Sequence, residues 1–424
     1  MRGEIGMAEN TRQHPYKRNM FLCSLLFATF VFIFLNSDRA EATELKVKTY
    51  TVKVTTTPIN TTYMKYSVYN KYTNQYYMLR SYLEQLEKDG GGTLILTAGT
   101  YKICNTLYVP SHVTIYFEDG VIIKKTGTTG TSLLQSSASI FQLVAPSKSR
   151  TKSAYGGYNG ETDIQLIGKG TAIIDLNFLN DVLGLIIGHN TDVTISGITF
   201  KNMQGGHFIE LDASQNVTIE NNIFIHHKSS ASGIKEAINL DTPDKSTGGL
   251  HAIWTNYDCT PNKDILIQNN YFDDLERAIG THKYSGGKYH ENVQILNNKI
   301  SNTTSDAIRI LNWLNPVIKD NEIKMVAESN SNKRAILASG LINPTITNNT
   351  FMEAPRPIQI MPWKNTDGGS QYAITYNDIS VANMSLMLKN KLVHVGEKFI
   401  RVNKRYNIYS SYTDKYYFYS EQKD

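Results

Sequence analysis

A short pattern of alternating apolar and polar positions recurs through the middle of the chain. Its clearest copy reads NVTIENNIF, and six copies begin at Asp192, Asn216, Asp264, Asn292, Asn315 and Asn343. Most copies begin roughly 20 to 30 residues apart, which is typical of a solenoid. One longer interval leaves room for an insertion. Because a half-apolar strand cannot bury its own apolar side, the copies are expected to stack and share one core.

The two asparagines inside the pattern predict how each repeat turns. Asparagine tolerates positive φ and therefore suits a tight turn. Asparagines at the same place in successive repeats are also expected to hydrogen-bond to one another along the solenoid axis. The pattern predicts an all-β fold, a single-stranded right-handed parallel β-helix.

A second short apolar strand precedes each copy and fixes the register. Its sequence is FIELD, AINLD, AIGTH, AIRIL, AILAS and PIQIM in successive repeats. Period-two alternation predicts that the isoleucines of this strand point inward and stack. They are Ile209, Ile238, Ile279, Ile308, Ile336 and Ile358.

The same alternation places two columns of side chains on the outer surface. The first column is expected to hold Glu210, Asn239, Gly280, Arg309, Leu337 and Gln359. The second is expected to hold Asp212, Asp241, His282, Leu311, Ser339 and Met361. Carboxylates, an imidazole and a guanidinium thus meet on one sheet surface, which makes this region the candidate functional site.

The first residues have the order of a secretory signal peptide. Lys17 and Arg18 precede an apolar run over 20–35, and Ala40-Glu-Ala42 offers a small-residue cleavage site. This pattern predicts a signal peptide over 1–42 and a secreted, extracellular protein. After cleavage, no stable membrane association is expected.

The remaining chain divides by composition. Residues 43–77 form a Thr- and Tyr-rich linker or cap segment, and 78–380 form the β-helix domain. Apolar positions 79, 82 and 86 predict a short amphipathic helix over 78–88 that covers the first rung. Residues 381–424 form a second Tyr-rich segment.

Composition limits the partners. The chain has 424 residues, a formal net charge of +5 and 19% charged residues. A modest positive charge favours an anionic polysaccharide over nucleic acid as the partner. We expect a monomer.

The segment Gly90-Gly-Gly-Thr-Leu-Ile-Leu-Thr-Ala-Gly-Thr-Tyr101 resembles the opening motif of the pectin-lyase-like superfamily of right-handed parallel β-helices. Within it, the chain resembles the polygalacturonase family of glycoside hydrolases, which places Asp, Asp, His and Arg-Ile-Lys on successive turns. Asp212, Asp241, His282 and Arg309-Ile310 follow that order, with Leu311 at the lysine position. The resemblance implies cleavage of an acidic polysaccharide.

Glycoside hydrolysis requires one protonated carboxylic acid and one carboxylate that activates water. We expect Asp241 to be the acid and Asp212 or Glu210 the base. Arg309 is expected to hold a substrate carboxylate through two hydrogen bonds. His282 is expected to tune Asp241 or to contact the sugar. This mechanism needs no cofactor.

Two other functions remain open. A polysaccharide lyase or epimerase acting on a uronate would use Ca²⁺, and Glu210, Asp212 and Asp241 are candidate oxygen ligands. Lys283, Arg309 or His282 would then act as the base. The third alternative is a glycan-binding or adhesive protein without catalysis, which needs only an exposed surface with aromatic side chains.

Substrate-binding candidates surround the two columns. They are Asn239, Lys283, Trp313, Trp363 and, in the long insertion between two repeats, His251 and Asp258. A further column at the strand starts carries mixed charges and is expected to be a structural charge ladder. It consists of Glu236, Arg277, Asp306, Arg334 and Arg356. No spacing indicates a metal site.

Overall fold

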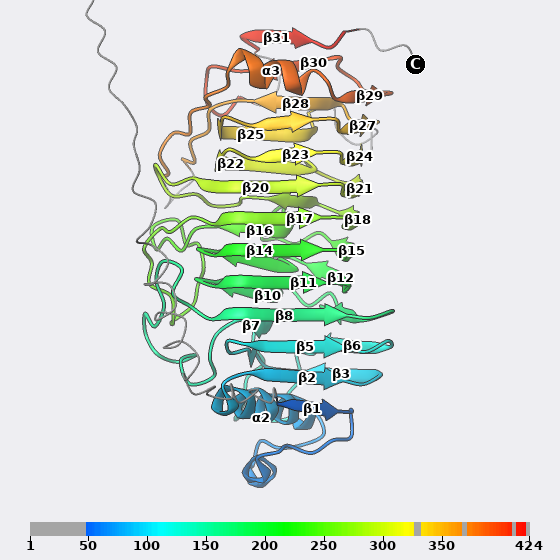
Figure 1. The fold of residues 1–424 in the computed structure, drawn as a ribbon, viewed down its shortest axis with the longest axis vertical. Helices are drawn as coiled ribbons and strands as arrows, with labels where there is room; N and C mark the ends of the chain where they lie inside the picture. Colours follow the sequence, from blue (N-terminus) through cyan, green and yellow to red (C-terminus); the bar gives the residue numbers. More distant parts are fainter. Residues whose placement is uncertain (1–47, 326–331, 367–370, 409–412, 421–424) are drawn as a thin grey trace, which may run out of the picture. The chain divides into compact units, whose positions relative to one another are not determined.

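A computed structural model describes residues 48–325, 332–366, 371–408 and 413–420. The expected signal peptide over 1–42 lies outside these residues. Within residues 47–424, short strands stack along one axis, with helix α2 (Asn74–Asp89) at one end and strand β31 (Lys415–Phe418) at the other (Figure 1). No helix in the described part of the chain is long and apolar enough to cross a membrane.

The strands form three parallel ladders, and the chain visits the ladders in turn. The first ladder contains β1 (Thr49–Val52), β2 (Gly92–Leu96), β5 (Val113–Phe117), β8 (Thr162–Gly168), β11 (Thr191–Ser196), β14 (Gln215–Glu220), β17 (Lys263–Gln268), β20 (His290–Leu296), β23 (Val317–Lys319) and β26 (Thr345–Thr347). The second contains β4 (Leu107–Tyr108), β7 (Ser139–Gln142), β10 (Leu183–Gly188), β13 (Ile209–Asp212), β16 (Glu236–Asp241), β19 (Arg277–Gly280), β22 (Ile308–Leu314), β25 (Arg334–Ile342), β28 (Arg356–Ile360) and β30 (Phe399–Val402).

The third ladder completes each rung. It contains β3 (Gly99–Ile103), β6 (Val121–Lys125), β9 (Ile173–Asp175), β12 (Thr199–Gln204), β15 (Ile223–Lys228), β18 (Tyr271–Leu275), β21 (Lys299–Thr303), β24 (Glu322–Met325), β27 (Thr350–Met352) and β29 (Lys391–Val393). The architecture is a right-handed parallel β-helix, as the sequence pattern predicted.

The predicted inward stack is confirmed. In the second ladder Ile209 pairs with Ile238, Ile238 with Ile279, and Ile279 with Ile308. The column continues through Ile336 and Ile358, and all of these side chains are fully buried. Apolar side chains in register on successive rungs remove one another from water, which is the main stabilising contribution in a solenoid.

Each recurring pattern forms two strands joined by a corner rather than one strand. β14 ends at Glu220, Asn221 has a φ of 56°, and β15 begins at Ile223. The second asparagine of each pair is buried, and its side-chain oxygen accepts the backbone amide of the asparagine one rung earlier. This ladder runs through Asn222, Asn270, Asn298, Asn321, Asn349 and Asn390. The expected hydrogen bonding along the axis is therefore confirmed.

Both ends of the solenoid are covered. Helix α2 packs on β2, β3 and β4, so the predicted helical cap is present. It begins at Asn74, earlier than residue 78, because Tyr76 and Tyr77 are buried on the same side of the helix. The preceding segment contributes β1 and a short 3₁₀-helix, η1 (Thr61–Lys65).

The β-helix extends beyond residue 380, which corrects the expected boundary. Strands β29 and β30 continue the third and second ladders, and β31 pairs antiparallel with β30. Helix α3 (Val381–Met387) covers β26. Part of the second Tyr-rich segment therefore forms the last rung.

Two long loops pack against the outer surface of the second ladder. One follows β7, and the other is the insertion between β16 and β17. Trp254 of the insertion is buried with Tyr155 and Ile186, and its indole nitrogen donates to Gln142 Oε1 at 2.9 Å. These loops give the sheet a side wall.

Candidate functional site

The two outward columns lie on the second ladder. Glu210 pairs with Asn239, Asn239 with Gly280, and Gly280 with Arg309. In the other column Asp212 pairs with Asp241. The predicted register is therefore confirmed for the first column and for Asp212 and Asp241 of the second, although the side chains fall into two separate cavities.

The first cavity, which we call the carboxylate pocket, has a volume of about 330 Å³. It is bounded on one side by the insertion after β16. Its lining residues are Asp181, Leu183, Ile186, Gly206, His207, Glu210, Ser232, Lys235, Asn239, Asp241, Gly248, Leu250, His251, His282 and Lys283.

Glu210 lies in this pocket with little exposure to solvent. Its Oε2 accepts a hydrogen bond from Asn239 Nδ2 at 3.0 Å and lies 3.6 Å from His207 Nε2. Burial, followed by the nearby charge of Asp241, raises the pKa of Glu210 to about 8. Glu210 is therefore a neutral carboxylic acid at neutral pH.

Asp241 holds the loop that follows β19. Its Oδ1 accepts the backbone amides of His282 at 2.9 Å and Lys283 at 2.7 Å. Burial raises the pKa of Asp241 to about 7, and the two amides oppose this rise. One of the two carboxyl oxygens of Asp241 thus already accepts two hydrogen bonds from the main chain.

Asp212 is fully buried beneath the other two carboxyl groups. Within the described part of the chain, neither of its side-chain oxygens has a hydrogen-bond partner. Burial and the charges of Glu210 and Asp241 raise its pKa well above the ordinary value. Burial thus favours the neutral form of Asp212, and it also keeps the carboxyl group out of reach of a substrate.

His282 does not occupy the outward column. Strand β19 ends at Gly280, because the following residues turn toward Asp241. The imidazole Nδ1 instead lies 3.8 Å from Glu236 Oε2, and burial lowers the pKa of His282 to about 3. The imidazole is neutral and still lines the pocket.

The sequence reasoning missed His207. Its Nδ1 lies 2.6 Å from the backbone oxygen of Glu236, and burial lowers its pKa to about 4. A signal was available, because His207 precedes Ile209 by the same interval as Glu236 precedes Ile238. Extending the charged column one rung earlier would have found it.

The expected charge ladder is present and buried. Arg277 pairs with Glu236 on one side, and its Nη2 lies 3.7 Å from Asp306 Oδ2 on the other. Arg334 Nε lies 2.9 Å from Asp306 Oδ1. Burial acts to raise the pKa of Glu236, but Arg277, His282, His207 and Arg309 together outweigh it and lower the pKa to about 2. The charge ladder is a structural network, and both cavities lie next to it.

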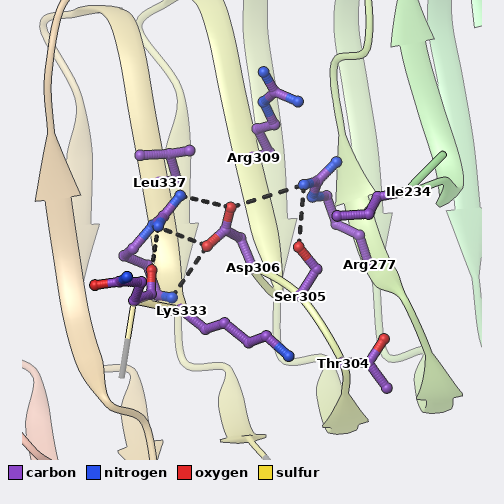
Figure 2. A pocket seen from close by; sticks show the side chains of 10 residues that line it. Ile234, Arg277, Thr304, Ser305, Asp306, Arg309, Lys333 and Leu337 are labelled. Carbon is purple, nitrogen blue, oxygen red and sulfur yellow. Dashed lines mark hydrogen bonds and ion pairs between the residues drawn. The ribbon is translucent and has the colours of Figure 1, made fainter. Parts of the chain in front are cut away.

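The second cavity, which we call the arginine pocket, has a volume of about 570 Å³. Figure 2 shows Asp306 shared between two guanidinium groups, while Arg309 points away from it. The lining residues are Ile234, Arg277, Thr304, Ser305, Asp306, Arg309, Asn332, Lys333, Arg334 and Leu337. Arg309 therefore lies in a different cavity from Glu210 and Asp241.

Gly280 stands between the two cavities in the outward column. A Cβ at this position would lie 2.8 Å from the backbone oxygen of Arg309 and 3.3 Å from Arg277 Cδ. A larger residue at this position would therefore clash first with the backbone of the next rung.

The two tryptophans predicted to bind substrate differ in their exposure to solvent. Trp313 is fully buried, and its Nε1 donates to Thr281 Oγ1 at 2.8 Å, so it cannot form a sugar platform as expected. Asn312, with a φ of 56°, interrupts the alternation of β22 and turns Trp313 inward. Trp363 is only partly buried, and the Arg309 guanidinium lies 5.6 Å from the centre of its ring.

The other predicted substrate-binding residues do not all lie at the carboxylate pocket. Lys283 and the exposed His251 line the carboxylate pocket, and Lys283 Nζ donates to the backbone oxygen of Gly248 at 2.9 Å. Asp258 does not line it. Its carboxylate accepts the backbone amides of Gly157 and Thr260, which joins the two long loops.

The donors do not fit a calcium site. Among the described residues, no group of three or more His, Cys, Asp or Glu side chains is arranged to hold a metal ion. Asp212 is fully buried, and one oxygen of Asp241 is already bound by backbone amides. No step through Ca²⁺ is derived from this arrangement.

Several known proteins resemble this chain. The plasmin and fibronectin-binding protein A of Streptococcus pneumoniae is 26% identical over 283 residues, covering 62% of this chain. The chain spans only 38% of that relative's length. The crystal structure of PfbA, a surface adhesin of the same species, has a TM-score of 0.55 at 21% identity and covers 78% of this chain and 75% of that one.

An exopolygalacturonase of Yersinia enterocolitica is more distant. It covers 86% of this chain and 79% of its own, with a TM-score of 0.44 at 13% identity. A family model described as the right handed beta helix region matches residues 183–409, which is more than half of the 424 residues. With its three parallel ladders and continuous inward stack, the chain belongs to the right-handed β-helix family.

Proposed function

We propose that this chain is an extracellular adhesive protein that binds carbohydrate at the carboxylate pocket without cleaving it. The observation that supports this most is the state of the carboxyl groups. Asp212 is inaccessible, and Asp241 already holds two backbone amides. Of the carboxyl groups that the hydrolase prediction assigned to catalysis, one candidate base is thus buried and the predicted acid is engaged by the main chain.

The chemistry of the pocket suits sugar hydroxyl groups. Neutral Glu210 can both donate and accept a hydrogen bond, and Asn239 adds an amide beside it. Lys235, Lys283 and His251 border the cavity with further donors. Such a lining binds polar, uncharged groups through hydrogen bonds and needs no proton transfer.

The relatives support an adhesive role. The similar pneumococcal protein carries plasmin and fibronectin binding in its name, and its solved form is described as a surface adhesin. By analogy we place this chain outside the cell, which agrees with the secretory pattern over 1–42. Fold-level analogy alone does not define a ligand, so plasmin and fibronectin enter the test beside polysaccharides.

Hydrolysis is the second candidate, and one observation favours it. Glu210, with its pKa raised to about 8, is a protonated carboxylic acid at the edge of a cavity. This is the property required of a general acid. In this mechanism Glu210 replaces Asp241 as the acid, and Asp241 is the remaining candidate for the base.

The variant Glu210→Gln separates the two functions. Glutamine has the shape of a protonated glutamic acid but cannot release a proton. We expect the full chain to bind at least one member of a panel of neutral and acidic polysaccharides, plasmin and fibronectin, with no new products in mass spectra. Glu210→Gln should bind that ligand within about 3-fold of the wild-type affinity, since only about one weak interaction changes.

Removal of a lysine charge at the carboxylate pocket or away from it tests where the ligand binds. Lys235→Ala, at the pocket, should weaken binding, whereas Lys245→Ala, on the exposed insertion, should not. Saturated oligosaccharide products that fall at least about 10²-fold in Glu210→Gln would establish a hydrolase instead. Products with an ultraviolet-absorbing unsaturated bond would establish elimination.

A further inference from the structure

Another cavity lies at the end of the solenoid that helix α2 covers (Figure 1), between this helix and the loop that follows β7. This cavity, which we call the cap pocket, has a volume of about 160 Å³. Its lining includes Tyr76, Arg80 and Glu84 of the helix, Tyr108 of β4, and Ser149 and Arg150 of the loop. We propose that the cap pocket binds a tetrahedral oxyanion, a phosphate or sulfate group, through Arg150 and the hydroxyl group of Tyr108.

The cap pocket is small, and its walls are held in place. Its volume corresponds to about five water molecules at roughly 30 Å³ each, so one small group fits and a polymer segment does not. A carboxylate oxygen of Glu87 on α2 accepts the backbone amide of Ser147 at 3.1 Å, which fixes the loop against the helix. Within the loop, Ser149 Oγ donates to Pro146 O at 2.8 Å. The cavity therefore exists before a ligand binds.

Arg150 is the cation that remains available to an anion. Its side chain is exposed and has no hydrogen-bond or ion-pair partner among the described residues. Arg80, in contrast, is engaged, since its Nε lies 2.7 Å from Glu84 Oε1 and its Nη1 donates to the Tyr76 hydroxyl group at 3.4 Å. The second oxygen of Glu84 accepts the hydroxyl group of Tyr63. The carboxylate of the lining thus has partners of its own, and the charge of Arg150 is not offset by an ion pair.

Tyr108 supplies a hydroxyl group near both guanidinium groups. It is half-buried on β4, and no described residue is hydrogen-bonded to its hydroxyl group. Burial raises the pKa of Tyr108, while the nearby charges of Arg150 and Arg80 act to lower it. The phenol is therefore protonated at neutral pH and can donate a hydrogen bond to a ligand that the two positive charges attract.

The origin of the donors favours a tetrahedral anion over a carboxylate. A single guanidinium group already satisfies both oxygens of a carboxylate. Here the donors reach the cavity from three elements, which are helix α2, strand β4 and the loop. A phosphate group presents three strong acceptor oxygens, so it satisfies more of these donors than a carboxylate does. Arginine also matches the geometry of phosphate recognition.

The cap pocket is separate from the carboxylate pocket. Tyr108 and Glu210 lie in one outward column, three rung steps apart, with Gln142 and Ile186 between them. Trp254 covers both intermediate rungs, because it packs on Ile186 and donates to Gln142. Anion binding at the cap pocket is therefore independent of the ligand of the carboxylate pocket.

The experiment is calorimetric titration of the full chain with sodium phosphate, sodium sulfate and sodium acetate in chloride buffers of matched ionic strength. We expect phosphate or sulfate to bind, and acetate to bind about 10-fold more weakly, because it leaves donors unpaired. Arg150→Gln should weaken the binding of phosphate or sulfate by about 10-fold, since charge-assisted hydrogen bonds are lost. Tyr108→Phe should weaken it by about 5-fold, since only the hydroxyl group is removed.

Glucose 6-phosphate distinguishes two sources of the same group. Tighter binding of this ester than of inorganic phosphate would support the site and identify a sugar as the carrier. Equal or weaker binding of the ester would support the site and identify the free anion as the ligand, provided that Arg150→Gln weakens both.

The matched control is Lys148→Gln, because this exposed lysine lies in the same loop but does not line the cavity. It should change binding less than about 2-fold, since exposed charges are screened by salt. An equal loss in Lys148→Gln and Arg150→Gln would show unspecific charge attraction and overturn the site. Binding of acetate as tight as that of phosphate and sulfate would overturn the tetrahedral preference. Absence of binding by all of these anions, in a chain that unfolds cooperatively on heating, would refute the proposal and leave the proposed function untouched.

Discussion

At the scale of single residues, the unusual feature is a group of three buried carboxyl groups on two adjacent rungs. Burial raises the pKa of Glu210, Asp212 and Asp241, and the nearby charge of Asp241 adds to the rise in the other two. They share few compensating hydrogen bonds in the described structure. The folded protein therefore retains protons at neutral pH that the unfolded chain releases, and this difference makes stability depend on pH.

The first prediction is that the free energy of unfolding decreases as pH rises from about 6.5 to about 8. In this window the unfolded carboxyl groups are ionised, whereas folded Glu210 titrates near 8 and Asp241 near 7. The folded state binds more protons, so the slope is negative, up to about 1.4 kcal/mol per pH unit for each group. The buried imidazoles of His189, His207, His282 and His290 have lowered pKa values in the folded state, so they oppose this slope near pH 6.5, where unfolded histidines are half protonated, and contribute little above about 7.5.

Urea unfolding at several pH values measures this slope. Glu210→Gln should make it shallower, since one titrating group is removed. Glu322→Gln is the control, because that side chain is 47% exposed. A free energy that rises over this window, or a slope that is identical in Glu210→Gln, would contradict the assignment of neutral buried acids.

The orientation of single side chains was predicted correctly where inward and outward positions alternate along a strand. The prediction failed where the backbone departs from this alternation. The pairing of Glu210 with Asn239 follows directly from period two. Trp313 was wrong as a sugar platform because the left-handed Asn312 reverses the inward and outward positions. His282 left its column because Asp241 binds the following loop.

At the scale of elements, the asparagine corners join the first ladder to the third. Each buried asparagine accepts the amide of its predecessor and donates to backbone oxygens of neighbouring strands. Asn298, for example, accepts from Asn270 N at 2.9 Å and donates to Ile267 O at 2.9 Å. Such corners satisfy buried backbone groups that the strands themselves cannot reach.

The second prediction compares the two asparagines of one corner. Asn298→Ala should lower the free energy of unfolding by about 3 kcal/mol, because several buried polar groups lose their partners. Asn297→Ala should cost only about 1 kcal/mol, mainly for an alanine in the left-handed region, since Asn297 is exposed with a φ of 52°. Urea midpoints for both variants test this order, and an equal or reversed cost would refute the structural role of the buried ladder.

At the scale of the whole described unit, the solenoid depends on its covered ends. Helix α2 packs on the strands of the first rung, and Leu86 is fully buried at this contact. Without the helix, the first rung would present unpaired strand groups and apolar side chains to other molecules. The cap thus protects the edge that the repeat itself leaves open.

The third prediction is that Leu86→Asp promotes self-association. A buried aspartate should detach the helix and expose the first rung, so light scattering after gel filtration should detect species larger than those of the wild type. Lys88→Asp, in the same turn but exposed, should behave as the wild type. Unchanged size in Leu86→Asp would show that the helix is not what protects this edge.

The sequence by itself determined the repeat, the inward isoleucine stack and the partners in the first outward column. It could do so because neighbours in a parallel β-helix are equivalent positions of successive repeats, and equivalence is visible in the spacing of residues. The asparagine ladder was predicted for the same reason.

Only the tertiary structure decided which polar side chains reach a cavity and in what charge state. That outcome depends on groups far apart in sequence, such as the Asp306 carboxylate between two arginines and the insertion that walls the carboxylate pocket. Burial, more than the type of amino acid, makes Asp212 inaccessible and Glu210 neutral. Local alternation carries no information on burial by a loop, because loop packing is set by contacts outside the repeat.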